Sequence, residues 1–351
     1  MIHKLTDLAV NSKPLVPADL PVPVPGPGEI LLRVHACGVC HTELDEIEGR
    51  TPPPVLPVIP GHQVIGVVEA RGQGSELYNI GDRLGVAWIY ASCGHCEYCL
   101  SGRENLCPGF RATGRDVNGG YAEFMVAGEK FAYPIPEIFS DEEAAPLLCA
   151  GAIGYRSIRL TGFKIPTGND VDIVHEGYPE TLGLTGFGAS AHLVLKMVSY
   201  IWPMTRVYVF ARSDRERSFA LQLGAVWAGN SGDPPPEKMD AIIDTTPAWK
   251  PIVDAMKNLK SGGRLVINAI RKESQDKESL LLLDYPAHLW MEKEMKSVAN
   301  VTSRDVSEFL ALASKIPIRP EIQVYDLAEA NTALYELKQG KIRGAKVLKI
   351  G

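Results

Sequence analysis

The chain has 351 residues, of which 45% are hydrophobic, so it can bury a large core and is expected to divide into two domains. Its 36 basic and 42 acidic residues give a formal net charge of -6, which makes nucleic acid an unsuitable main partner. The N-terminal segment has no signal-peptide pattern and no stretch of eighteen apolar residues occurs, so we expect a cytoplasmic protein that does not enter the membrane.

The first notable segment is VHACGVCHTELDEIEG, which follows a strand-like run over residues 30–34 and contains Cys37 and Cys40. Further along, His62 follows a Pro-Gly turn and opens an apolar run over residues 64–68 that predicts a second strand. A third cysteine, Cys149, lies in AAPLLCAGAIGY. Cys40, His62 and Cys149 form a Cys2His set, the ligand type that leaves zinc a fourth position for water or substrate. Spacing alone supports this grouping weakly, because isolated cysteines and histidines are usually packed core residues.

Four cysteines lie within fifteen residues, at positions 93, 96, 99 and 107. The spacing C-x2-C-x2-C-x7-C lets Cys93, Cys96, Cys99 and Cys107 surround one tetrahedral ion, and zinc suits four thiolates best. Two alternatives remain open. An iron-sulfur cluster is compatible with Pro108 after the last cysteine, but its usual final gap is shorter. Four unliganded surface thiols would be prone to oxidation. A closed four-ligand zinc site would be structural.

The second half of the chain predicts a nucleotide-binding domain. Residues 182–198 run from an apolar strand into a helical pattern, and G-x-G-x-x-A lies at the junction. This glycine-rich turn comprises Gly186, Phe187, Gly188, Ala189, Ser190 and Ala191. The strand RVYVF, the helix SDRERSFALQLGA and the strands AIIDT and GGRLVINAI follow. Such alternation is typical of a doubly wound parallel sheet, and the alternative is an α/β domain with another ligand or none.

The strand Val207–Phe210 runs into Ala211-Arg212-Ser213, with no carboxylate at its tip. An acidic residue at this point would favour NAD, whereas Arg212 can pair with a 2′-phosphate and Ser213 can donate a hydrogen bond to it. We therefore expect NADP rather than NAD. Two observations oppose this expectation: Asp214 follows directly and could turn inward, and the arginines could form a solvated helix face.

Together these segments resemble a zinc-dependent alcohol dehydrogenase of the medium-chain dehydrogenase/reductase superfamily. The resemblance is carried, in order along nearly the whole chain, by CGVCHTE, PGH, the four cysteines, NGGYAEF, LLCAG, the glycine-rich turn and GKIRGAKVLKI. It implies an α/β protein with a GroES-like, β-rich catalytic domain over residues 1–152 and 303–351. A Rossmann coenzyme domain over 153–302 is inserted into it, and the structural zinc occupies a lobe at about 93–107.

The resemblance also implies residue roles. It assigns catalytic zinc to Cys40, His62 and Cys149, a packed thiol to Cys37, a proton-relay hydroxyl to Thr42 and a cofactor contact to His41. Trp88 matches an aromatic wall of the substrate pocket, with a plain core position as the alternative. The family would use two zinc ions per chain, a small alcohol, aldehyde or ketone as substrate, and a homo-oligomer, with a tetramer favoured over a dimer.

Three residues and one segment depart from the family pattern. Gln63 replaces a glutamate beside the ligand histidine, which should make the site more positive. Glu43 replaces an aspartate, which leaves its contact with His62 in doubt, and Asp45 stands where many members carry the relay histidine. Residues 164–181 form an unusually long link, in which we expect His175 and Glu176 to lie in a solvated loop.

The expected reaction is the reversible oxidation of an alcohol to an aldehyde or ketone by hydride transfer to a nicotinamide cofactor. Zinc would make the alcohol proton easier to remove, as it does for bound water. Two other functions remain possible. One is a non-catalytic, zinc-stabilised nucleotide-binding protein, and the other is a zinc-free quinone or enone reductase of the same superfamily, which would have no use for the three ligand residues.

Overall fold

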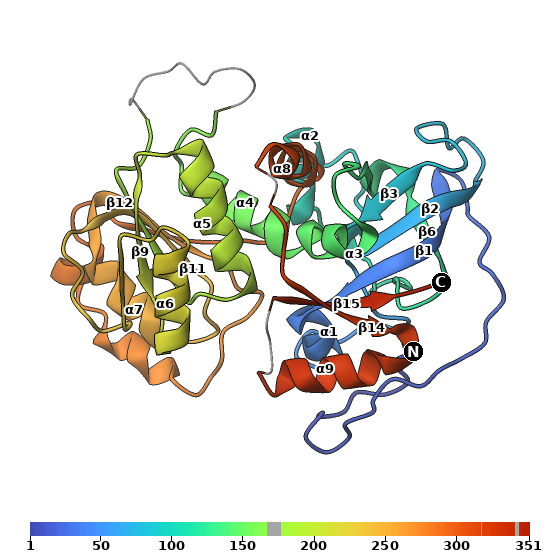
Figure 1. The fold of residues 1–351 in the computed structure, drawn as a ribbon, viewed down its shortest axis with the longest axis horizontal. Helices are drawn as coiled ribbons and strands as arrows, with labels where there is room; N and C mark the ends of the chain where they lie inside the picture. The colour runs from blue at the N-terminus through green and yellow to red at the C-terminus, as the bar shows by residue number, and fades with distance from the viewer. Residues whose placement is uncertain (167–176, 317, 341–343) are drawn as a thin grey trace. The chain divides into compact units, whose positions relative to one another are not determined.

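The structure is a computed structural model that describes residues 1–166, 177–316, 318–340 and 344–351. The chain forms two compact units, Met1–Ala152 with Asn300–Gly351, and Ile153–Ala299 (Figure 1). His175 and Glu176, for which a solvated loop is expected, lie outside the described residues. No helix in the described part of the chain combines the length and apolar character needed to cross a membrane.

The first unit is built around a seven-stranded, mainly antiparallel sheet. Its strands, in order across the sheet, are β14 (Ile322–Asp326), β15 (Ala345–Lys349), β1 (Glu29–Val39), β2 (Val64–Arg71), β3 (Arg83–Val86) and β7 (Ala132–Pro134), with β6 (Phe124–Gly128) also paired to β1. Because the C-terminal β15 pairs with the N-terminal β1, both ends of the chain contribute to one sheet. β1 is almost fully buried, as expected for a central strand.

Short helices and a small hairpin complete the first unit. The helices are α1 (His41–Ile47), α2 (Glu97–Leu100), α3 (Asp141–Ala144), α8 (Ser303–Lys315) and α9 (Ala330–Lys338), and the strands β4 (Ile89–Ala91) and β5 (Arg111–Ala112) pair with each other. Helix α4 (Ala150–Leu160) begins at the end of this unit and continues into the next. Both α3 and α8 begin at a hydroxyl residue that forms a capping box, which satisfies amides left unpaired at a helix start.

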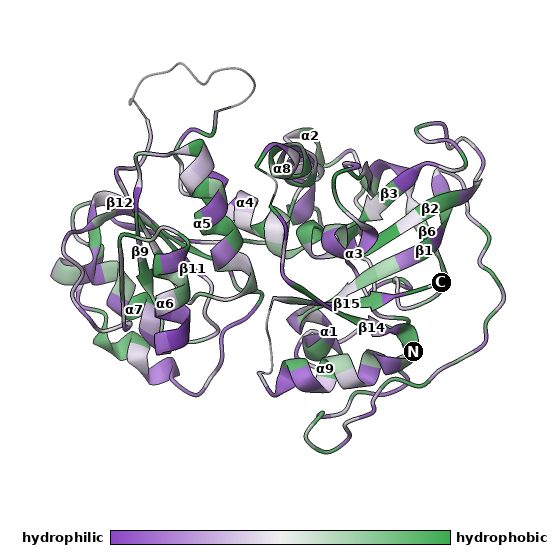
Figure 2. Ribbon diagram, in the orientation of Figure 1, coloured by the Kyte–Doolittle hydropathy of each residue, from purple (hydrophilic) through white to green (hydrophobic). Residues whose placement is uncertain are grey.

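The second unit contains a six-stranded, fully parallel sheet. Its order is β10 (Trp227–Gly229), β9 (Arg206–Phe210), β8 (Thr181–Thr185), β11 (Met239–Asp244), β12 (Leu259–Ile267) and β13 (Glu294–Ser297). Helices α5 (Ala189–Ile201), α6 (Asp214–Gln222) and α7 (Lys250–Lys257) lie between the strands in sequence. The strands β9 and β11 are largely hydrophobic, whereas α6 carries mostly hydrophilic residues (Figure 2).

Numbered along the chain, these strands have the order 3-2-1-4-5-6, which is the order of the dinucleotide-binding Rossmann fold. The chain reverses its direction of growth between β8 and β11, so ligands are expected beyond the carboxyl ends of these two strands. The predicted fold class, a β-rich GroES-like domain combined with a doubly wound parallel sheet, is therefore confirmed.

Candidate metal and cofactor sites

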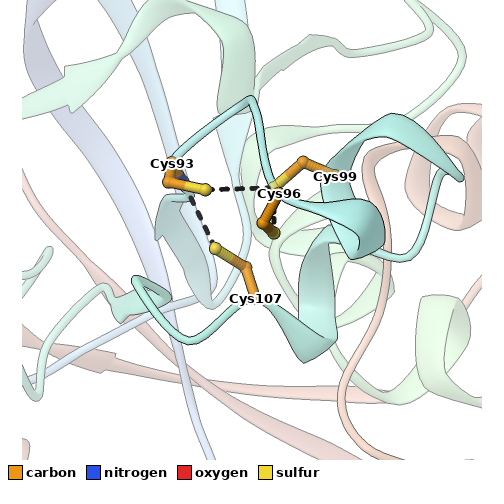
Figure 3. Close-up of side chains that lie close together, drawn as sticks. All are labelled: Cys93, Cys96, Cys99 and Cys107. Atoms are coloured by element: carbon orange, nitrogen blue, oxygen red, sulfur yellow. Dashed lines mark hydrogen bonds between the residues drawn. The ribbon is translucent and has the colours of Figure 1, made fainter.

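The four predicted cysteines of the loop 93–107 converge on one point (Figure 3). Their sulfur atoms all lie within 4.8 Å of one another. The Sγ atoms of Cys96 and Cys99 are 3.6 Å apart, and those of Cys93 and Cys99 are 3.9 Å apart. Four thiolates at the usual zinc–sulfur bond length would be separated by about 3.8 Å. The donor set and its dimensions therefore fit a closed tetrahedral zinc site.

Backbone amides turn toward the sulfur atoms of this loop. The amides of Cys93 and Gly109 each lie 3.3 Å from the Cys107 Sγ. Amide hydrogen bonds stabilise a thiolate, the form that binds a metal. All seven cysteines of the chain are free thiols, so none is withdrawn from metal binding by a disulfide.

A second convergent set joins Cys40, His62 and Cys149, whose candidate donor atoms lie within 4.8 Å of one another. Cys40 follows β1 and caps α1, His62 directly precedes the buried stretch that leads into β2, and Cys149 directly precedes α4. The Cys40 Sγ lies 3.8 Å from the His62 Nε2. Three donors of this type could hold a zinc ion and leave one coordination position open.

Glu43 connects two of these three residues. Its Oε1 lies 2.6 Å from the His62 Nδ1, and its Oε2 accepts a hydrogen bond of 2.9 Å from the Cys40 amide. The carboxylate is fully buried. A histidine whose Nδ1 bonds to a carboxylate presents Nε2 as the metal-binding nitrogen. The contact left in doubt by the Asp-to-Glu departure is therefore made.

The electrostatics of this three-ligand site favour a cation. The adjacent Cys149 thiol, burial and the Glu43 carboxylate all raise the pKa of the Cys40 thiol well above its usual range. A bound cation would reverse this preference, because metal coordination requires the thiolate and releases the proton. The Cys40 thiol is therefore expected to keep its proton until a metal binds and displaces it.

The residues that follow Cys40 occupy different environments. Thr42 is half-buried, with its Oγ1 3.3 Å from the Cys40 Sγ. His41 is exposed at the first position of α1. Asp45 is buried, and its carboxylate accepts a hydrogen bond of 2.5 Å from the Arg50 Nε. Asp45 therefore forms an ion pair with Arg50, which the sequence did not indicate.

Trp88 stands between an aromatic ring and a cation. The Trp88 ring centroid lies 5.5 Å from the Phe110 ring centroid, and the Arg115 Cζ lies over the indole, 5.4 Å from the Trp88 ring centroid. The ring is only half-buried, but the indole Nε1 is buried without a hydrogen-bond partner among the described residues.

Glu46 is a functional candidate that sequence reasoning missed. It is 1% exposed, and neither carboxylate oxygen has a hydrogen-bond partner within the described chain. Burial and the Glu43 charge raise its pKa well above the usual range, whereas His62, Arg115 and the Trp88 indole act in the opposite direction. The indole thus lies near the carboxylate without a hydrogen bond of normal geometry. The sequence pattern of α1 could not indicate which of its acidic residues are buried, because five consecutive residues of this short helix are buried regardless of polarity.

Glu46 also changes the interpretation of Gln63. Gln63 is buried, and its Nε2 has no hydrogen-bond partner in the described part of the chain. The expectation of a more positive site is based on the uncharged amide of Gln63 and does not include other carboxylates near the ligands. Glu46 supplies another buried carboxylate close enough to affect His62.

The glycine-rich turn lies at the carboxyl end of β8, as predicted. Gly186 has a φ of +76°, which only glycine adopts readily, and its amide bonds to the Phe210 carbonyl at 2.8 Å. A side chain on Gly188 would meet no atom within 4 Å, so open space lies over this residue. Gly188 caps α5 without a side-chain hydrogen bond, which leaves the first amides of a thirteen-residue helix available to an anion.

The rest of the turn packs inward. Phe187 is buried against Phe219 with ring centroids 5.7 Å apart, and Ala191 is fully buried. Ala189 begins α5, and the Ser190 Oγ accepts a hydrogen bond of 3.2 Å from Asn268. The turn thus has the open backbone and the close helix packing that a dinucleotide pyrophosphate requires.

At the end of β9, Arg212 is exposed and has no hydrogen bond or ion pair with a described residue. Ser213 caps α6, and its hydroxyl donates to the Glu216 carboxylate at 2.7 Å. Asp214 does not turn inward: its side chain is 96% exposed and bonds to Arg217. The predicted guanidinium is therefore available, whereas the predicted serine donor is engaged.

Comparison with known proteins identifies the family. Residues 26–137 match the alcohol dehydrogenase GroES-like domain. The chain is 40% identical over 347 residues to a probable alcohol dehydrogenase, AdhA, of Mycobacterium tuberculosis, covering 97% of this chain and 94% of the relative. It is 31% identical to an alcohol dehydrogenase of Geobacillus stearothermophilus, with 96% and 97% covered. The chain belongs to the zinc-type medium-chain alcohol dehydrogenases.

A solved structure agrees with this assignment. The cinnamyl alcohol dehydrogenase of Sorghum bicolor superposes with a TM-score of 0.76 at 26% identity, covering 94% of this chain and 92% of that one. An alcohol dehydrogenase that uses a nicotinamide cofactor is therefore the supported function. The two other functions considered from the sequence, a non-catalytic nucleotide-binding protein and a quinone or enone reductase, are not favoured.

The buried Glu46 leads to a stability prediction. Because its pKa is raised in the folded chain, folding opposes ionisation, and the resulting penalty grows as the pH rises above the ordinary carboxyl pKa. Glu46→Gln should therefore increase the free energy of unfolding at pH 8, by about 1.4 kcal/mol for every pH unit separating the two pKa values. Urea denaturation of the metal-free protein at pH 5 and pH 8 would measure it, because a bound cation would itself offset the charge.

Asp45→Asn is the matched control on the same helix. It removes the charge from a buried carboxylate that is paired with Arg50, so it should lower the unfolding free energy at both pH values. A gain for Glu46→Gln that is equal at pH 5 and pH 8 would contradict the raised pKa.

Proposed function

We propose that this alcohol dehydrogenase holds one catalytic and one structural zinc per chain and prefers NADP to NAD. The observation that carries the proposal is the Cys2His set whose histidine is oriented by Glu43. Cys40, His62 and Cys149 would hold the catalytic ion, and the four cysteines of the loop 93–107 would hold the other. Open and closed ligand sets correspond to these two roles.

In the proposed mechanism, zinc held by Cys40, His62 and Cys149 would supply a Lewis acid for the substrate oxygen, and a nicotinamide bound at the glycine-rich turn would supply the hydride acceptor. Thr42 holds the alcohol proton at its Oγ1 and passes it outward. Glu43 keeps the His62 ring in one tautomer and one orientation. Asp45 ends the relay as an acceptor, but its bond to Arg50 has to weaken when the proton arrives, so we expect it to contribute less than Thr42.

The substrate side of the proposal involves Trp88. Its exposed part would form an aromatic wall for the organic group of the alcohol, and the Phe110 and Arg115 contacts fix the ring. His41, exposed at the start of α1, would approach the cofactor pyrophosphate. The residues of the glycine-rich turn would bind that pyrophosphate through backbone amides.

The cofactor preference is supported by the charges at the end of β9. Arg212 is exposed and pairs with no residue that the structure describes, and Asp214 bonds to Arg217. A 2′-phosphate would gain a charge-assisted hydrogen bond at this position. The Ser213 hydroxyl would have to leave Glu216 before it could join, so Arg212 carries most of the preference.

A homo-oligomer is the remaining part of the proposal. All four residues of β13 are exposed, and β13 is an edge strand of the six-stranded sheet as described. Large exposed hydrophobic residues precede it, namely Leu281, Leu282, Tyr285, Trp290 and Met291. An unpaired strand edge beside apolar side chains favours pairing with a second copy, and two-fold pairing is compatible with the expected tetramer. The free thiols suit the expected cytoplasmic location.

The two metal sites predict different consequences of ligand loss. Cys40→Ser should abolish turnover and leave one zinc per chain and a nearly unchanged melting temperature, because only the open site is lost. Cys99→Ser should lower the melting temperature first, because the closed site stabilises the loop 93–107. Metal analysis by mass spectrometry and calorimetry would test both. Loss of the same zinc from both variants would contradict two separate sites.

The cofactor preference can be tested with Arg212→Ala. We expect the parent to have a higher kcat/KM with NADP than with NAD, and the variant to lose about 10-fold or more with NADP alone, as for loss of one charged hydrogen bond. Steady-state kinetics with both cofactors would measure this, with Arg215→Ala as the control on α6. A parent preference for NAD, or equal losses with both cofactors, would overturn the assignment.

A further inference from the structure

A buried ion pair lies at the carboxyl edge of the parallel sheet, where the chain reverses its direction of growth. Asp244 is the last residue of β11 and is fully buried, and Lys272 follows β12 with a side chain only 8% exposed. The Lys272 ammonium bonds to the Asp244 carboxylate and donates to the Thr246 carbonyl at 2.5 Å. Burying a charge pair costs desolvation free energy, so the position of this pair at the ligand-binding edge points to a function in ligand binding.

The Asp244 carboxylate also connects to the strand that carries the glycine-rich turn. Its Oδ1 accepts hydrogen bonds from the Thr185 hydroxyl at 2.5 Å and from the Thr246 hydroxyl at 2.7 Å. Thr185 is the last residue of β8 and directly precedes Gly186. A side chain on Gly186 would lie 3.0 Å from the Thr246 Cγ2, so Thr246 packs closely on the turn. The Asp244 carboxylate therefore binds both the residue before Gly186 and the threonine that packs on Gly186.

Lys272 extends this network to a third strand. The segment 268–273 begins at the end of β12, where the Asn268 amide bonds to the Asp244 carbonyl at 2.7 Å. The Asn268 side chain then donates to Ser190 in the glycine-rich turn. Within this unit, the ends of β8, β11 and β12 are thus joined through Asp244, Lys272 and Asn268.

We propose that Asp244 and Lys272 are a positioning pair for the nicotinamide half of the cofactor. In a Rossmann sheet, the first three strands bind the adenine half and the last three bind the other half. Asp244 ends one strand of the second set, Lys272 follows another, and their ion pair holds the segment 268–273 at that edge. The inference rests on the nicotinamide cofactor of the proposed function. A preformed site saves the ordering cost of binding.

The test compares whole dinucleotides with fragments that carry only the adenine half. Lys272→Met should weaken the binding of NADPH and NADH about tenfold, within the usual range for coupled neighbours. The binding of 2′,5′-ADP and AMP should change by less than about twofold, because the first three strands keep their arrangement. Equilibrium fluorescence titration of the metal-loaded protein measures all four. Lys272→Arg should restore much of the dinucleotide affinity.

The double variant Asp244→Asn/Lys272→Met separates positioning from the cost of a buried unpaired charge. We expect it to recover the melting temperature that Lys272→Met loses, while dinucleotide affinity stays low. Arg206→Met, which breaks the exposed pair with Glu237 in the same unit, is the control and should affect neither quantity. Parental dinucleotide affinity in Lys272→Met or in the double variant would overturn the positioning pair. Equal losses for dinucleotides and fragments would overturn it as well, because they would indicate general loosening.

The parent protein distinguishes this proposal from the proposed function. If the parent binds neither reduced dinucleotide, the proposed function fails, and the positioning pair fails with it. If the parent binds and the variants bind equally well, the positioning pair alone is overturned.

Discussion

The three-ligand site of the first unit depends on two hydrogen bonds made by the Glu43 carboxylate. Glu43 binds the Cys40 amide with one oxygen and the His62 ring with the other, so the start of α1 and the residue before β2 are fixed by one side chain. The same bonds serve two purposes. The first completes a helix cap, and the second sets the tautomer of a candidate ligand. The cap of α1 and the orientation of His62 therefore depend on the same side chain.

This dependence explains why a longer acidic residue can replace the usual aspartate. In a capping box, the third helical residue must reach back to the amide of the capping residue, and glutamate is the preferred residue for that reach. Glu43 satisfies this geometry with Oε2 and still reaches His62 with Oε1. The added methylene group thus gives α1 a standard cap without giving up the histidine contact.

The sequence predicted what depends on spacing and period, and it missed what depends on side chains meeting from distant segments. The four clustered cysteines and the glycine-rich turn are local patterns, so their geometry could be anticipated from 15 and 6 consecutive residues. The family resemblance supplied Cys149, far from Cys40 in sequence. Neither source indicated the pairing of Asp45 with Arg50, which lies beyond the end of α1. The charges on α1 are instead buried, and burial is decided by the sheet and loops around it.

The two unanticipated carboxylates, Glu46 and Asp244, differ in a way that bears on their roles. Asp244 accepts hydrogen bonds from two hydroxyl groups and from the Lys272 ammonium, so its charge is compensated within the described fold. Glu46 accepts no hydrogen bond from the described residues, and its burial raises its pKa. A compensated buried charge fixes geometry, whereas an uncompensated one stores a cost that a bound cation can offset. The first arrangement suits a preformed cofactor edge. The second suits a site that reaches its full stability only when the cation is present.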